Sequence, residues 1–175
     1  MGRAFSPEVT LFTSMFVYAG FFHVAGNMLY LWIFGNNVED SMGKIRFTLF
    51  YLLCGLGAAL AQIAVSPASR VPMVGASGAI SGVLSAYLLL FPQARVLTLI
   101  PLGFFTQLAE IPAVIVLGFW IVVQVFNGLL TFNFAGGGVA WFAHVGGFVV
   151  GMVLVGLFKR RGVPWGWHSR KRSVK

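Results

Sequence analysis

Charged residues are scarce in this 175-residue chain, and acidic ones are the scarcest. Only 9% of the residues are charged, with four carboxylates among them, whereas a soluble domain carries about 25% charged residues. Hydrophobic residues make up 58% of the chain, and the mean hydropathy is +0.88. These values exclude a disordered chain, a coiled coil and an ordinary soluble globule, and they predict an all-α polytopic membrane protein.

The sequence predicts no intrachain disulfide and shows no signal-peptide pattern and no tandem repeat. The single cysteine, Cys54, lies in an apolar run and cannot form an intrachain disulfide. The N-terminus has no cleavable signal-peptide pattern, and no tandem repeat is visible.

Long apolar runs are abundant, and they predict five transmembrane helices of about 20 residues each. These runs cover residues 21–38, 45–65, 76–91, 113–130 and 139–158. Residues 1–20 are too interrupted to span, so we expect an extracytoplasmic loop or interfacial segment there, and residues 159–175 form a basic cytoplasmic tail. Residues 96–105 are apolar but broken by Pro101 and Gly103, so this stretch is expected to end or re-enter near one membrane face.

The positions of lysine and arginine orient the predicted helices. If the C-terminus is cytoplasmic, ten of the 12 basic residues lie inside, and only Arg3 and Arg70 lie outside. The ten inner residues are Lys44, Arg46, Arg95, Lys159, Arg160, Arg161, Arg170, Lys171, Arg172 and Lys175. We therefore interpret the net charge of +8 as a topology signal and expect no nucleic-acid partner. With five spans, the N-terminus lies outside.

This orientation brings four polar residues to one depth near the outer face. His23 and Asn27 share one face of the first predicted helix because they are four residues apart. Ser77 lies in the first turn of the third helix, and His144 lies in the second turn of the fifth. Such groups at membrane depth mark functional sites by default. Interhelical hydrogen bonds for His23, Asn27 and His144, and helix packing around Ser77, remain the structural alternatives.

A G-x-S-G motif surrounds Ser77, whose backbone N–H has no intrahelical partner at a helix start. A nucleophilic serine needs a base within hydrogen-bond reach, and His144 is the candidate. Glycines spaced four apart follow both Ser77 and His144, and such small-residue faces would let the two helices approach closely. No carboxylate shares this depth, which favours a Ser–His dyad over a triad. His23 and Asn27 would then donate hydrogen bonds to the oxyanion.

Three motifs occur in order along residues 12–158 of the chain. They are His23-Val-Ala-Gly-Asn27 with the following Leu31-Trp-Ile-Phe-Gly35-Asn-Asn-Val-Glu39-Asp40, then Gly75-Ala-Ser77-Gly78, then Ala143-His144-Val-Gly-Gly147-Phe-Val-Val-Gly151. In this combination the sequence resembles the rhomboid family of intramembrane serine proteases. Residues 21–158 would form the rhomboid-like transmembrane domain.

The resemblance implies that Ser77 is the nucleophile, that His144 is the general base, and that His23, Asn27 and the Ser77 N–H stabilise the oxyanion. The implied reaction is hydrolysis of a peptide bond in or beside a transmembrane segment of a membrane-protein substrate, without a metal or cofactor. We expect a multi-pass protein of a prokaryotic plasma membrane, with its active site near the outer face. The oligomeric state is not predicted.

Two features depart from the family pattern. Rhomboids have a core of six helices and only five are predicted here, so the family's first helix is expected to be missing before residue 1. Some members carry a tyrosine that stacks on the catalytic histidine, at the position of Ser81. We expect another aromatic residue, such as Trp141 or Phe142, to hold the His144 ring instead.

Two other functions are weighed against proteolysis. A catalytically silent rhomboid-like protein that binds transmembrane segments is the main alternative, because the first helix is missing. A channel or transporter subunit is a third class. The sequence argues against it, because the polar residues cluster at one end of the helices and do not cross the bilayer.

Overall fold

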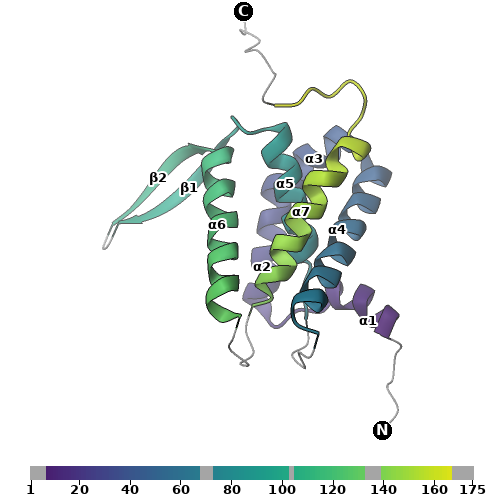
Figure 1. The fold of residues 1–175 in the computed structure, drawn as a ribbon. Coiled ribbons are helices and arrows are strands. Elements are labelled where there is room, and N and C mark those ends of the chain that lie inside the picture. Colours follow the sequence, from purple (N-terminus) through teal and green to yellow (C-terminus); the bar gives the residue numbers. More distant parts are fainter. Residues whose placement is uncertain (1–6, 68–72, 103–104, 133–138, 167–175) are drawn as a thin grey trace, which may run out of the picture.

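The computed structural model describes residues 7–67, 73–102, 105–132 and 139–166. The chain forms a bundle in which α5 contacts helices on several sides, and α7 makes extensive contacts with both α4 and α5 (Figure 1). The elements are α1 (Pro7–Thr13), the 3₁₀ turn η1 (Ser14–Phe16), α2 (Phe21–Tyr30), the π-helical turn η2 (Leu31–Gly35), α3 (Asn36–Met42), α4 (Lys44–Val65), α5 (Ser77–Leu90), β1 (Arg95–Leu102), β2 (Phe105–Pro112), α6 (Ala113–Thr131) and α7 (Trp141–Phe158).

Helices occupy all five predicted apolar runs, but fewer of them are long enough to span a membrane. α4, α6 and α7 meet the length and hydropathy needed, and the pair Val9–Phe16 and Phe21–Met42, bent by 89°, makes a fourth span if it is counted as one. α5 has only 14 residues and is about 21 Å long, against about 30 Å of bilayer hydrocarbon. The apolar helices indicate an integral membrane protein with three to four candidate spans. The five spans stay a prediction.

The all-α prediction is wrong for the segment between α5 and α6. The described part of residues 96–105, a stretch expected to end or re-enter near a membrane face, belongs to the antiparallel pair β1–β2, which joins Arg95 to Pro112 at its base. The hairpin extends away from the bundle (Figure 1). Pro101 cannot continue a helix, and the Val-, Leu- and Ile-rich sequence around it suits a strand.

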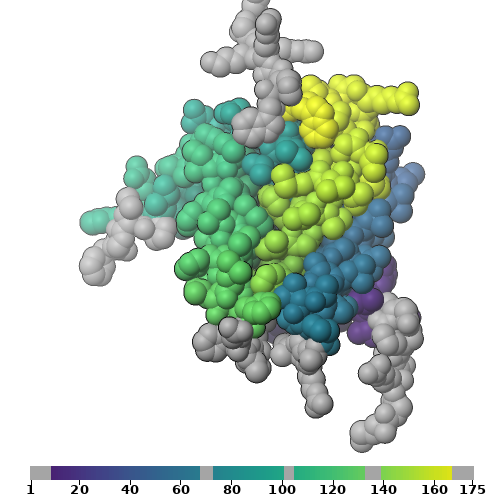
Figure 2. Space-filling view, viewed as in Figure 1, coloured from purple at the N-terminus to yellow at the C-terminus, as the bar shows by residue number. Residues whose placement is uncertain are grey.

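α5 is the buried centre of the bundle, with every residue from 78 to 87 buried. A Cβ atom added at Gly147 of α7 would collide with the carbonyl oxygen of Gly78 on α5. One added at Gly151 would lie 2.5 Å from the carbonyl oxygen of Gly82. The two backbones therefore touch, as small residues in membrane helices allow, and the beginnings of α5 and α7 come together. Figure 2 shows α7 lying between α6 and α4 on one face of the molecule.

The two ends of the bundle differ in charge. At one end lie the beginnings of α5 and α7, and there the N–H of Ala143 donates to Oε1 of Gln62 at the far end of α4, at 3.1 Å. At the other end, the N–H of Arg160 donates to the carbonyl of Ser41 at 2.9 Å. The described basic residues belong to segments at this second end: Lys44, Arg46, Arg95, Lys159, Arg160 and Arg161. The remaining ones lie outside the described residues: Arg3, Arg70, Arg170, Lys171, Arg172 and Lys175.

We expect Gly147→Val to destabilise the protein by about 3 kcal/mol, because no space exists for a side chain beside the Gly78 carbonyl. Thermal unfolding in detergent micelles, followed by circular dichroism, measures this change. Gly118→Ala on α6 is the matched control, since nothing lies within 4 Å of a Cβ atom there, and it should melt at or slightly above the wild-type temperature. Wild-type melting of Gly147→Val would contradict the close contact of α5 and α7.

Candidate active site

Ser77 and His144 meet where α5 and α7 begin. Gly75 has φ +106°, a conformation that favours glycine, and it turns the chain just before α5 begins at Ser77. Its N–H is anchored to the carbonyl of Ser14 at 2.9 Å. The Oγ of Ser77 lies 2.8 Å from the Nε2 of His144. The fold thus joins by a hydrogen bond two residues that lie 67 positions apart in the sequence.

Gln124 on α6 contacts the other nitrogen of the His144 ring. Its Oε1 lies 2.7 Å from the Nδ1 of His144, and its side chain is 6% exposed. An amide oxygen can only accept, so Nδ1 must carry the ring proton, and Nε2 then holds the lone pair that accepts from the Ser77 hydroxyl. This is the tautomer that a general base needs.

Gln124 was not predicted as a site residue from the sequence. The available signal was an amide inside the apolar run of α6, four residues after Trp120. Polar groups at membrane depth mark functional sites by default, so this glutamine qualified as a candidate. The sequence did not indicate which neighbouring helix it would face.

Two tryptophans hold the His144 ring. The ring centroid of Trp120 lies 6.0 Å from that of His144, and the ring of Trp141 approaches edge-on at 6.3 Å. The expected contact of Trp141 is confirmed. Phe142 is not the partner, because its ring packs edge-on against Phe132 at 6.0 Å. Trp120 was not foreseen.

Ser81 has a different role from the family tyrosine that it replaces. Its side chain is fully buried, and its Oγ donates to the carbonyl oxygen of Ser77 at 2.7 Å. The hydroxyl therefore bonds within α5, one turn back along the helix, as serines in helices commonly do.

His23 is half-buried on α2 and lies beside the turn that precedes Ser77. A Cβ atom added at Gly75 would lie 2.8 Å from the Nε2 of His23, so a larger residue at position 75 would collide with the His23 ring. The N–H of Ala19 donates to the Nδ1 of His23 at 3.3 Å. Because Nδ1 accepts, a neutral His23 carries its proton on Nε2, which makes this nitrogen a donor at the Gly75 turn.

Asn27 lies one turn further along α2 and is 7% exposed. Its Nδ2 donates to the carbonyl of His23 at 2.7 Å, which leaves one amide hydrogen for another acceptor. Its Oδ1 is buried without a partner among the described residues.

The beginning of α5 adds backbone donors and an internal space. The first N–H groups of a helix lack intrahelical acceptors and carry a partial positive charge, and Ser77 is the first residue of α5. A cavity of about 20 Å³ adjoins Ser77, which is room for about one water molecule. It is lined by Ser14, Met15, Gly55, Ala58, Ala59, Met73, Val74, Gly75, Ser77, Gly78, Ala79 and Ala143.

The arrangement therefore combines a hydroxyl, an oriented base and hydrogen-bond donors near one another. These are the elements of acyl transfer through a serine nucleophile. Within the described ranges, no three His, Cys, Asp or Glu side chains come together as metal ligands would.

Comparison with known proteins identifies one family. The profile of the Rhomboid domain matches residues 7–161. The chain is 32% identical to RHOMBOID-like protein 1 of Arabidopsis thaliana, over 94% of the chain and 40% of that protein. It is 28% identical to the mitochondrial Rhomboid protein 1 of Saccharomyces cerevisiae, over 97% of the chain and 44% of that protein. It is 34% identical to the Rhomboid protease GluP of Bacillus subtilis, over 81% of the chain and 24% of that protein. The chain thus spans less than half the length of these relatives.

Proposed function

Because the chain belongs to the rhomboid family, we propose that it is an intramembrane serine protease that cleaves peptide bonds in or next to transmembrane segments of membrane proteins. The observation that carries the proposal is the 2.8 Å contact between the Oγ of Ser77 and the Nε2 of His144. Among the relatives, GluP of B. subtilis is named a protease.

The first half of the reaction forms an acyl-enzyme. The Oγ of Ser77 attacks the carbonyl carbon of the scissile bond while the Nε2 of His144 takes the hydroxyl proton. His144 then gives this proton to the leaving amine, and the C–N bond breaks. The proton on Nδ1 stays with the ring throughout, because it is donated in a hydrogen bond to the Oε1 of Gln124, 2.7 Å from Nδ1.

The oxyanion of the tetrahedral intermediate is stabilised by three donors. They are the backbone N–H of Ser77, the Nε2–H of His23 and the second amide hydrogen of Asn27. The bonds that fix His23 and Asn27, from Ala19 N–H and to the His23 carbonyl, support these roles. Loss of one such donor typically lowers turnover by about 10²–10³-fold.

The second half of the reaction releases the acyl group. A water molecule attacks the ester carbonyl, His144 takes its proton, and the proton returns to the Oγ of Ser77 as the C–O bond to serine breaks. The cavity of about 20 Å³ beside Ser77 supports this step, because it has room for the attacking water.

The short α5 supports a reaction site inside the bilayer. If the basic end of the bundle lies at the inner face, α5 reaches about 21 Å outward. Ser77 then lies roughly 9 Å below the outer edge of a hydrocarbon core of about 30 Å. Water must reach this depth through the protein, which is consistent with the polar groups gathered there.

We place the C-terminus in the cytoplasm and the site near the outer face of a prokaryotic plasma membrane. The described basic residues belong to the end of the bundle opposite Ser77, in agreement with the positive-inside rule. The relatives include mitochondrial and chloroplastic proteins, so they support a membrane location in general and the prokaryotic plasma membrane is our proposal.

An activity measurement on the purified full chain tests the proposed function. Reconstituted in liposomes, the protein should react with a fluorophosphonate probe and cleave a single-span membrane protein into two fragments, identified by mass spectrometry. Denaturation before the probe is added should abolish the labelling. A folded protein that neither labels nor cleaves would favour the alternative, a catalytically silent rhomboid-like protein that binds transmembrane segments.

A further inference from the structure

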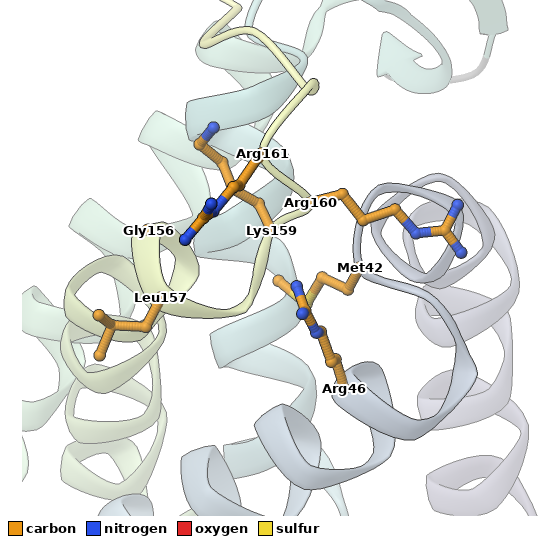
Figure 3. Close-up of a pocket in the computed structure, with 7 residues that line it drawn as sticks. All are labelled: Met42, Arg46, Gly156, Leu157, Lys159, Arg160 and Arg161. Carbon is orange, nitrogen blue, oxygen red and sulfur yellow. The ribbon is translucent and has the colours of Figure 1, made fainter.

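A basic pocket lies at the end of the bundle opposite Ser77. It encloses about 690 Å³ between the α3–α4 turn and the chain that leaves α7 (Figure 3). The residues that line it are Met42, Arg46, Gly156, Leu157, Lys159, Arg160 and Arg161. Four of these seven residues are cationic and none is acidic.

The backbone fixes the walls of this pocket. The N–H of Arg160 donates to the carbonyl of Ser41 at 2.9 Å, which joins the end of α7 to the end of α3. Gly43 turns the chain between α3 and α4 with φ +85°. The Nη2 of Arg160 lies 2.7 Å from the place that a Cβ atom of Gly43 would take. Arg160 thus lies along the turn, and Arg46 extends from α4 toward the segment after α7 (Figure 3).

The cations of the pocket have no carboxylate partner among the residues that the structure describes. Within the described ranges, no ion pair shorter than 4.0 Å neutralises Arg46, Arg160 or Arg161. The Nζ of Lys159 donates to the carbonyl of Val163 at 2.7 Å and lies 5.0 Å from the centre of the Trp165 ring. A concentrated positive charge at the inner end of a membrane bundle attracts phosphate groups.

We propose that this pocket binds the phosphate of an anionic phospholipid. Guanidinium groups such as those of Arg46 and Arg161 match the oxygens of a phosphodiester. A lipid also explains the apolar border of the pocket, because Leu157 is 77% exposed and Val153, one turn away on α7, is 71% exposed. The acyl chains lie along this stripe while the headgroup occupies the pocket. The inference does not rest on the proposed proteolysis.

Native mass spectrometry of the full chain in detergent tests the lipid site. Phosphatidylglycerol should bind more tightly than phosphatidylcholine, and Arg46→Gln or Arg161→Gln should each weaken phosphatidylglycerol binding about fivefold, which corresponds to about 1 kcal/mol. Lys44→Gln is the matched control, because Lys44 lies two residues from Arg46 on α4 but does not line the pocket. It should leave binding within about twofold of wild type.

Further measurements decide between the lipid and its competitors. Arg46→Lys keeps the charge but loses the paired donors of the guanidinium, so its phosphatidylglycerol binding should lie between that of wild type and that of Arg46→Gln. Equal losses in Lys44→Gln and Arg46→Gln would overturn the proposal in favour of diffuse surface attraction. Inorganic phosphate that binds as tightly as phosphatidylglycerol would overturn it in favour of a small-anion site.

Discussion

Ser77→Ala is expected to abolish both fluorophosphonate labelling and substrate cleavage, with turnover lowered by at least about 10⁴-fold. Alanine removes the Oγ that lies 2.8 Å from the base, and no other hydroxyl is bonded to His144 in the described part of the chain. The measurement is the initial rate of cleavage of a single-span substrate in liposomes, with in-gel labelling beside it. Ser85→Ala is the control, since Ser85 lies two turns deeper on α5 and its hydroxyl donates to the carbonyl of Gly82, within its own helix.

His144→Ala should reproduce the loss, and the double variant should be no worse than either single one. The effects on turnover of substituting residues that act as one catalytic unit are strongly non-additive, because the loss of either residue removes the whole pathway. Ser77→Ala with more than about 1% of wild-type turnover would show that another group is the nucleophile. Losses that multiply in the double variant would show that the two residues act independently.

The positions of the helices could be predicted because apolar runs and their interruptions are local features. Gly75 and Pro92 bound α5 in the sequence and in the structure. The approach of α5 to α7 was also foreseeable, since both carry glycines four residues apart and such faces allow backbones to touch. Three of the four polar residues chosen from the sequence, His23, Ser77 and His144, lie near the beginnings of α2, α5 and α7, and Asn27 lies in the second turn of α2.

The features that could not be predicted depend on the rotation of a helix about its own axis and on where the chain leaves the bundle. α6 is apolar over most of its surface and carries two amides, Gln124 and Asn127, so its sequence does not show which of them faces the neighbouring helices. The contacts of Gln124 and Trp120 with His144 follow from that rotation alone. The β1–β2 hairpin was missed because an apolar run of ten residues with a proline suits both a strand and a broken helix.

Gln124→Leu is the second prediction with a large expected effect, a fall in turnover of about 10²–10³-fold. Leucine has nearly the same volume but cannot accept the Nδ1 proton of His144, so the ring loses the partner that fixes its tautomer and orientation. The loss should be smaller than the roughly 10⁴-fold fall seen when the carboxylate of a serine protease triad is replaced, because a neutral amide orients the ring without adding charge. Steady-state kinetics should show the fall in kcat with KM nearly unchanged, since Gln124 contacts the base and not the substrate.

Asn127→Leu provides the matched control for this substitution. Asn127 lies three residues further along α6, and its amide donates to the carbonyl of Val123 at 2.9 Å, within its own helix. The same change of an amide to leucine there should leave kcat within about twofold of wild type, because it removes only a local helix bond. A matching fall in both variants, accompanied by lower melting temperatures, would assign the effect to the packing of α6. A wild-type kcat in Gln124→Leu would show that His144 keeps its tautomer without the amide, and the 2.7 Å bond would then serve only to fix α6 against α7.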